Sequence, residues 1–333
     1  MAINTEKGKG NVTAVSLFSG CGGFDWGVQQ AGVRIIWAND IDPCAEAAYR
    51  HLFPDTNFVS GDIRDVMVFP EADILIGCYP CTGFSLGSRR RWKDAGERDL
   101  KADQRNYLYE EFIRALGQVK PKYIFIENVR GMLSAESGWF FDRQLEAFNA
   151  SGYTIQHDKL HAADYGVPQS RKRVFIVGVR KDIKAFEYRF PLPSHGQLVG
   201  KPYNTIADAI GSMPDWPEGE FLDYPFHGHF LTRNRKRPWD GISYTIVANS
   251  HHVPLHPIGL PMRYVGKDHW ELQGDQNRRL SWRECAAIQG LPANISPGGN
   301  LDDKYRVVGN AVPPAFGFSL VKSVVDYESK RTG

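Results

Sequence analysis

The sequence predicts an α/β fold, a parallel sheet covered by helices on both faces, followed by a smaller and more irregular region. Short β-branched runs alternate with helical patterns through the first half of the chain. A glycine-rich turn closes the first apolar run, where a strand would pass into a helix. After about Arg189 the chain becomes rich in Pro, Gly and His, and helical patterns return only near its end.

The individual elements follow from apolar runs and helical spacing, taken in chain order. Pro43 suits the first turn of a helix. The polar stretch 79–105 follows an apolar run, and its length is typical of a functional loop. The expected strands lie at 14–18, 33–37, 72–78, 123–126, 152–161 and 174–179, and the expected helices at 24–31, 43–51, 106–120, 140–150, 281–289 and 313–325.

The length of 333 residues allows two globular units. We place the first domain at residues 1–189 and the second at 190–279, because the composition changes between them. Residues 280–333 regain helical patterns, so we expect this segment to return to the first domain and complete it.

Composition excludes several classes of protein. Hydrophobic residues make up 42% and charged residues 23%, which excludes a disordered, collagen-like or coiled-coil chain. A net charge of +2 excludes indiscriminate binding to polyanions. The N-terminus lacks a secretory signal and no long apolar window follows, so we expect a cytoplasmic protein without membrane contact. The 5 cysteines are odd in number and sparse, which favours reduced thiols.

Positive charge is concentrated in one part of the second region. Residues 221–280 hold 8 Lys or Arg and 5 acidic residues. Within them the run RNRKRPW, residues 233–239, interleaves basic and aromatic side chains. This pattern suits phosphate neutralisation and contact with bases, and a solvated loop is the alternative.

The glycine turn and the acids after the second strand suggest a cofactor site. Gly20, Gly22 and Gly23 lie between a strand and a helix, where a ligand can approach the backbone. Asp40 and Asp42 lie where an acidic residue commonly meets ribose hydroxyls. Together they favour a cofactor that contains adenosine, and a turn that merely closes the unit is the alternative.

Cys81, in GCYPCTGFS, lies just beyond the carboxyl end of an apolar strand, where open α/β sheets place their ligands. Basic residues at 89–91 and 93 in the same loop favour a reactive thiolate. Cys78 and Cys81 also form a C-x-x-C, but no second pair exists to complete a zinc site, and a redox dithiol normally opens a helix.

Three further charged residues lie at strand ends. Glu127 ends the run YIFIE at the same rim as Cys81, and it could act as a general acid or as a helix cap or ion-pair partner. Arg171 and Arg173 lie on one face before the strand VFIV. They could orient a planar base or a phosphate, or pair with acids on the rim.

Taken together, these motifs resemble the DNA (cytosine-5) methyltransferases of bacterial restriction–modification systems. The resemblance spans residues 15–321 and rests on FSGCGG, GDIRD, the PC of CYPCTGFS, ENVRG, QSRKR, RECAAIQGLP and GNAVPP, in that order. It implies a Rossmann-like, S-adenosylmethionine-dependent methyltransferase domain. A small, irregular, mostly β target-recognition domain would complete a cleft for DNA.

The resemblance implies S-adenosylmethionine as cofactor, S-adenosylhomocysteine as product, and no metal. Asp40 would meet the ribose, Asp62 the adenine amine and Asn310 the methionine end. Ile41 stands where many relatives have an aromatic residue against the adenine. The remaining residues of the implied pocket are Phe18, Gly20, Gly22 and Leu108.

The resemblance also implies the catalytic roles. Cys81 would attack C6 of a cytosine turned out of the duplex, Glu127 would act at N3, and Arg173 would hold O2. Arg171 would support the Cys81 loop or a phosphate. Thr82 departs from the family pattern, in which Gln is commonest. Implied DNA contacts in the loop are Ser85, Arg89, Arg90 and Arg91, and in the second region Arg233, Arg235 and Arg237.

The implied partners are double-stranded DNA and a cognate restriction endonuclease, and the implied state is a monomer. The second region resembles that of compact bacterial enzymes, some of which modify GGCC, so a short palindrome is the expected target. Two alternatives remain. A transfer RNA methyltransferase of the same fold would carry a Cys-Phe-Thr signature that is absent here. A catalytically silent DNA-binding module would have no reason to keep Cys81, Glu127 and Arg173.

Overall fold

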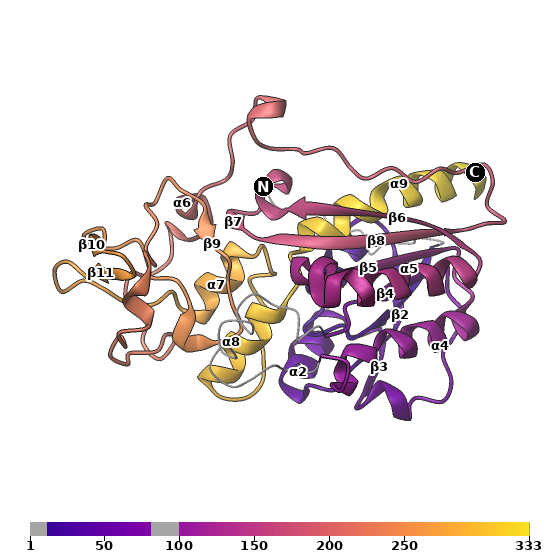
Figure 1. Ribbon diagram of the computed structural model, residues 1–333, viewed down its shortest axis with the longest axis horizontal. Coiled ribbons are helices and arrows are strands. Elements are labelled where there is room, and N and C mark those ends of the chain that lie inside the picture. Colours follow the sequence, from indigo (N-terminus) through magenta and orange to yellow (C-terminus); the bar gives the residue numbers. More distant parts are fainter. Residues whose placement is uncertain (1–11, 81–99, 333) are drawn as a thin grey trace.

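The computed structural model describes residues 12–80 and 100–332. A seven-stranded sheet runs through the larger part of the molecule, and an irregular region, which holds most of residues 190–279, lies beside it (Figure 1). The strand order is β3-β2-β1-β4-β5-β8-β6. These strands are β1 (Thr13–Leu17), β2 (Arg34–Asp40), β3 (Asn57–Ser60), β4 (Ile74–Gly77), β5 (Tyr123–Val129), β6 (Tyr153–His161) and β8 (Lys172–Arg180).

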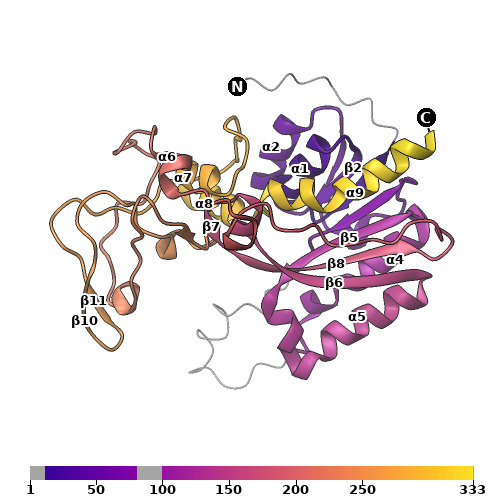
Figure 2. The same cartoon turned by 90° about the horizontal axis from the view of Figure 1, so that it is seen from above.

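Helices cover both faces of this sheet, as the sequence predicts. Figure 2 shows α1, α2 and α9 on one side and α5 on the other. Side chains of α4 share a buried cluster with those of α5. The helices are α1 (Gly23–Gln30), α2 (Pro43–Leu52), α4 (Tyr109–Val119), α5 (Trp139–Ala150), α7 (Trp282–Ile288), α8 (Leu301–Asn310) and α9 (Pro314–Thr332).

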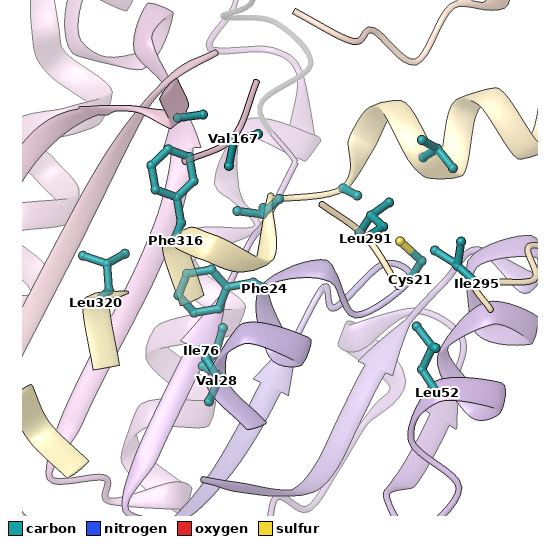
Figure 3. Close-up of a cluster of buried hydrophobic side chains, with 14 of the residues drawn as sticks. Cys21, Phe24, Val28, Leu52, Ile76, Val167, Leu291, Ile295, Phe316 and Leu320 are labelled. Carbon is teal, nitrogen blue, oxygen red and sulfur yellow. The ribbon is translucent and has the colours of Figure 1, made fainter. Parts of the chain in front are cut away.

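The central strands are buried on both faces, which explains why their sequences are continuous apolar runs. In β4, Ile76 packs with the cluster that includes α1 and α9, whereas Leu75 packs with the cluster that includes α4 and α5. Figure 3 shows Ile76 among Phe24 and Phe316, which come from α1 and α9. The sheet is therefore held rigidly between two helical layers.

Strand direction differs from the expectation of a wholly parallel sheet. β1, β2, β3, β4 and β5 pair in parallel, but β8 is antiparallel to both β5 and β6. The connection between β6 and β8, residues 162–171, is too short for a crossover helix. The winding of the sheet reverses between β1 and β4, and the carboxyl ends of such strands form the usual ligand crevice.

The closing helix α9 lies directly against α1 through glycines on both helices. A Cβ on Gly27 would lie 1.8 Å from the Pro314 carbonyl oxygen, and one on Gly317 would lie 2.1 Å from that of Phe24. A Cβ on Gly23 would likewise lie 2.4 Å from the Val312 carbonyl oxygen. The backbone contact brings the segment after Asn310 beside the start of α1.

Some elements were not predicted. β3 was missed because it has only 4 residues. α8 was missed because its sequence is mostly polar, although Asn300 and Asp303 form a capping box at its start. The irregular region adds α6 (Ile206–Ile210), a parallel pair of β7 (Gln169–Ser170) with β9 (Ser243–Tyr244), and an antiparallel pair of β10 (Arg263–Gly266) with β11 (His269–Glu271). Among the described helices, none has the length and apolar character that crossing a bilayer requires.

Candidate active site

The turn after β1 is sharply bent and tied to the end of β2. Phe18, Gly20 and Gly22 have φ of 56°, 54° and 80°, in the left-handed region. Asp40 holds the turn, because its carboxylate accepts a hydrogen bond from the Gly20 N–H at 2.7 Å and another from the Asp42 N–H at 2.9 Å. Burial raises the pKa of the Asp40 carboxyl above its usual value. Asp40 thus organises the backbone of the implied cofactor pocket.

Other implied cofactor residues lie at the same rim. Ile41 follows Asp40 and is 65% exposed, unusual for so apolar a side chain. Asp62 follows β3, and its carboxylate accepts hydrogen bonds from the backbone N–H and Nε of Arg64, each at 2.9 Å. Leu108 packs, partly buried, against the same cluster as Phe18. Asn310 is the exposed last residue of α8.

β4 leads toward the implied nucleophile. Its neighbour β5 is parallel, and the register pairs Gly77 with Ile126, so Cys78 and Glu127 follow side by side. Burial and then the nearby Glu127 carboxylate raise the pKa of the Cys78 thiol well above its usual value, so this sulfur is a poor nucleophile. Cys81 lies outside the described residues, as do Thr82 and the implied loop contacts Ser85, Arg89, Arg90 and Arg91.

Glu127 and Arg173 form an ion pair at this rim. Their Oε1 and Nε atoms are 2.9 Å apart, and the side chains are only 11% and 16% exposed. The antiparallel register pairs Glu127 with Phe175, which makes Arg173 its diagonal neighbour on the same face. Burial lowers the pKa of the Arg173 guanidinium, and the Glu127 carboxylate opposes that shift. The pair presents a carboxylate and a planar donor together.

Arg171, for which the resemblance implies a supporting role, makes its hydrogen bonds away from this pair. Its side chain is 2% exposed. Its Nη1 donates to the carbonyl oxygens of Ile246 at 3.1 Å and Gly309 at 3.3 Å. Burial and then Arg173 lower the pKa of Arg171 well below its usual value. Arg171 therefore positions the strand by joining it to the irregular region and to α8.

Gln169 and Gln289 complete this junction, and sequence reasoning assigned them no role. Gln169 accepts a hydrogen bond from the Ile246 N–H at 3.0 Å, and its amide lies 3.4 Å from that of Gln289. Gln289 in turn donates to the Val308 carbonyl oxygen. Both glutamines are fully buried. Their place within QSRKR and RECAAIQGLP was the only available signal.

The basic run of the irregular region divides into internal and external residues. Arg233 and Arg237 are exposed, and the Arg237 guanidinium lies 4.2 Å from the ring centre of Tyr244. Arg235 is instead 5% exposed, and its Nε donates to the Phe230 carbonyl oxygen at 2.9 Å. Arg235 was expected to contact DNA, and in the fold its guanidinium supports a loop.

Lys236 is a second internal cation. Its Nζ donates to the carbonyl oxygens of Ile258 at 2.7 Å and Leu260 at 2.9 Å, and to Asn277 Oδ1 at 2.8 Å. Burial lowers the pKa of Lys236 to about 8. A region with few strands has many carbonyl groups outside a ladder, and buried cations satisfy them here.

The described residues also bear on metal binding. Across residues 12–80 and 100–332, no group of three or more His, Cys, Asp or Glu side chains could hold a metal ion.

Comparisons with known proteins agree with this geometry. The family model described as C-5 cytosine-specific DNA methylase matches residues 12–326. The type II methyltransferase M.BsuRI of Bacillus subtilis is 36% identical over 95% of this chain and 80% of its own length. M.BspRI of Lysinibacillus sphaericus is 38% identical over 98% of this chain and 84% of its own length.

Solved structures share the fold at lower identity. The S. pombe Dnmt2 methyltransferase superposes with a TM-score of 0.69 and 19% identity, covering 96% of this chain and 99% of the other. The Entamoeba histolytica methyltransferase EhMeth gives a TM-score of 0.71 and 19% identity, covering 95% and 98%.

Proposed function

Since this chain belongs to the C-5 cytosine-specific DNA methylase family, we propose that it methylates a cytosine turned out of a short duplex sequence, through a bond between Cys81 and C6. The family methylates C5 of cytosine in DNA and depends on S-adenosylmethionine. The observation that carries the proposal is the Glu127–Arg173 pair, which lies beside the strand end that leads to Cys81. That arrangement offers an acid and an O2 donor within reach of one base.

The rim residues fit an adenosine cofactor. The exposed Ile41 offers an apolar surface to a flat ring. Asp40 and Asp62 offer carboxylate oxygens to hydroxyl and amine donors, and the turn at Gly20 leaves its backbone accessible, since a Cβ there would meet nothing within 4 Å. Further residues proposed to hold it are Phe18, Gly22, Leu108 and Asn310. When bound, S-adenosylmethionine supplies the sulfonium methyl group that C5 takes up, leaving S-adenosylhomocysteine.

The chain's own residues prepare the base for that transfer. The Cys81 thiolate bonds to C6 and pushes electron density onto C5, which is otherwise a weak nucleophile. Glu127, in its protonated form, donates to N3 and offsets the charge that develops on the ring. Arg173 donates to O2 and fixes the ring plane. A water molecule then takes the C5 proton, the C5–H electron pair re-forms the C5–C6 double bond, and the C6–S bond breaks so that Cys81 leaves as a thiolate.

The base must leave the helix stack, because sulfur and methyl group approach opposite faces of the ring. We infer that residues 190–279 form the target-recognition domain, and that 1–189 with 280–333 form the catalytic domain. Arg233 and Arg237, both exposed, are the proposed contacts to DNA in the first of these, alongside the loop residues Ser85 and Arg89 to Arg91. A short palindrome, with GGCC as a candidate, is the proposed target.

The biological setting is part of the same proposal. Relatives named type II methyltransferases cover nearly the whole chain. Their similarity supports a restriction–modification role in the bacterial cytoplasm, in which a cognate endonuclease cuts the same sequence. We propose that the enzyme acts as a monomer without a metal.

Bisulfite sequencing of plasmid DNA from cells that express the chain tests this function. We expect protected cytosines at one position of one short sequence, and none with Cys81→Ala. Transfer RNA incubated with the protein and labelled cofactor is the comparison substrate. Plasmid without protected cytosines, or label in transfer RNA alone, would contradict the proposal.

A further inference from the structure

A basic hollow lies beside the Glu127–Arg173 pair. It has a volume of about 480 Å³, and its lining includes Arg173 together with Arg130, Lys159 and Lys172. The side chains come from three neighbouring strands, since Arg130 directly follows β5, Lys172 begins β8, and Lys159 lies near the carboxyl end of β6. Four cations thus converge at the rim that carries the catalytic pair.

The strand register places Lys159 and Lys172 on one face of the sheet, whereas Arg173, next to Lys172 in β8, projects from the other face and borders the hollow at the rim. His161 on β6 pairs directly with Lys172 on β8, and Lys159 precedes His161 by two residues on the same face. Arg173 pairs with Val129, so the following Arg130 reaches the same rim. Like charges on neighbouring strands repel each other unless an anion lies between them.

Arg173 pairs with Glu127, whereas the other three cations of this hollow have no partner among the described residues. Within the described ranges, the side chains of Arg130, Lys159 and Lys172 make no hydrogen bond or ion pair. Asp164 is the acid of the lining, and it is engaged with Tyr203, whose hydroxyl donates to it at 2.8 Å. His161 also lines the hollow, and its buried Nε2 has no hydrogen-bond partner.

A second basic hollow provides the contrast. There the Lys122 Nζ lies 3.0 Å from a carboxylate oxygen of Asp73 and 3.0 Å from one of Glu328. Arg180 likewise pairs with Asp182 at 2.8 Å. Those cations are neutralised by the protein itself, whereas the cations beside Arg173 are available to an external anion.

We propose that the hollow lined by Arg130, Lys159, Lys172 and Arg173 binds a backbone phosphate of the DNA strand that carries the methylated cytosine. This rests on the proposed function, in which Arg173 holds that cytosine. A base that has left the stack stays joined to its strand through the phosphates on either side. One of these phosphates must therefore lie within a nucleotide's length of Arg173, where the hollow offers its unpaired cations.

Salt-dependent binding to duplex DNA that holds the methylated sequence tests the proposal. For Lys159→Gln and for Lys172→Gln, we expect the slope of log K against log salt concentration to fall in magnitude by at most about 0.9, because the hollow neutralises one phosphate and each variant removes one of its cations. The same relation gives at most roughly fivefold weaker binding at about 0.15 M salt. Lys184→Gln, the same charge change at the second hollow, should leave the slope unchanged, and Lys172→Arg should preserve it.

Neutral methylphosphonate linkages locate the phosphate. We expect one linkage next to the target cytosine to weaken binding by the wild type by up to about fivefold and binding by Lys172→Gln by less, because the effects of coupled groups are not additive. The inference would be overturned if the salt slopes of Lys159→Gln and Lys172→Gln equalled that of Lys184→Gln, or if the losses were additive at every linkage. The proposed function would still stand in that case, provided that the wild type methylates the duplex. A wild type that does not methylate the duplex would refute both.

Discussion

Replacing Glu284 by Gln should strongly destabilise the junction between the irregular region and α7. Glu284 is fully buried and accepts hydrogen bonds from Arg278 Nη1 at 2.8 Å and Nη2 at 2.7 Å, and from the Ser281 N–H at 2.7 Å. Glu284→Gln keeps the shape but leaves the Arg278 guanidinium, 2% exposed, without a counter-ion. Two charge-assisted bonds at about 1.5–3 kcal/mol each give a loss of about 3–6 kcal/mol.

Urea unfolding at neutral pH measures this loss, followed by tryptophan fluorescence. The matched control is Glu187→Gln, because Glu187 pairs with Arg189 at 3.2 Å where both side chains are 73% or more exposed. An exposed pair contributes at most about 1 kcal/mol. A loss below about 1 kcal/mol for Glu284→Gln, or equal losses for the two variants, would refute the reasoning that the buried pair holds the region in place.

Three further outcomes follow from the same structure. Gly27→Ala should lower the free energy of unfolding in urea by about 1–3 kcal/mol, because its Cβ would lie 1.8 Å from the Pro314 carbonyl oxygen. Gly117→Ala, whose Cβ would have no atom within 4 Å, should instead raise it by about 0.5–1 kcal/mol. Equal effects of the two substitutions would contradict the close contact of α1 and α9. Burial lowers the pKa of His256 to about 3, so between about pH 6.5 and pH 3 the unfolded chain binds a proton that the folded chain does not. As the pH is lowered through this range, the free energy of unfolding should therefore decrease by about 1.4 kcal/mol per pH unit. The free energy of unfolding of His256→Gln should decrease by about 1.4 kcal/mol per pH unit less than that of the wild type, and parallel pH profiles would exclude a neutral buried imidazole. Glu127→Gln should lower kcat about 10²–10⁴-fold in a methyl-transfer assay and leave cofactor affinity unchanged, and an unaltered kcat would remove Glu127 from the chemistry.

The rim arrangement could be predicted from the sequence because it depends on local order. Cys78 and Glu127 each stand at the end of an apolar run, and parallel strands bring the ends of such runs to one edge. Glu127 and Cys81 were predicted to share a rim on this ground. The parallel register of β4 and β5 places Cys78 beside Glu127, and Cys81 itself lies outside the described residues. The family was recognised from the same motifs, and the match over residues 12–326 confirms it.

The roles of the arginines could not be predicted, because they depend on partners far along the chain. Arg171 donates to carbonyl groups 75 and 138 residues away. Arg235 belongs to a basic run that resembles a DNA contact, yet it satisfies the carbonyl group of Phe230 inside the fold. A run of basic residues has the same sequence pattern whether its cations meet phosphates or loop carbonyls. Only the packing of the irregular region distinguishes the two.

The most direct measurement is covalent trapping on duplex DNA that contains 5-fluorocytosine at the target position, with S-adenosylmethionine present. Fluorine cannot leave C5 as a proton does, so the bond between Cys81 and C6 should persist and shift the protein on a denaturing gel. Cys81→Ala should give no shifted band, and Cys78→Ala should give one comparable with the wild type. A shifted band that survives Cys81→Ala and disappears with Cys78→Ala would contradict the mechanism.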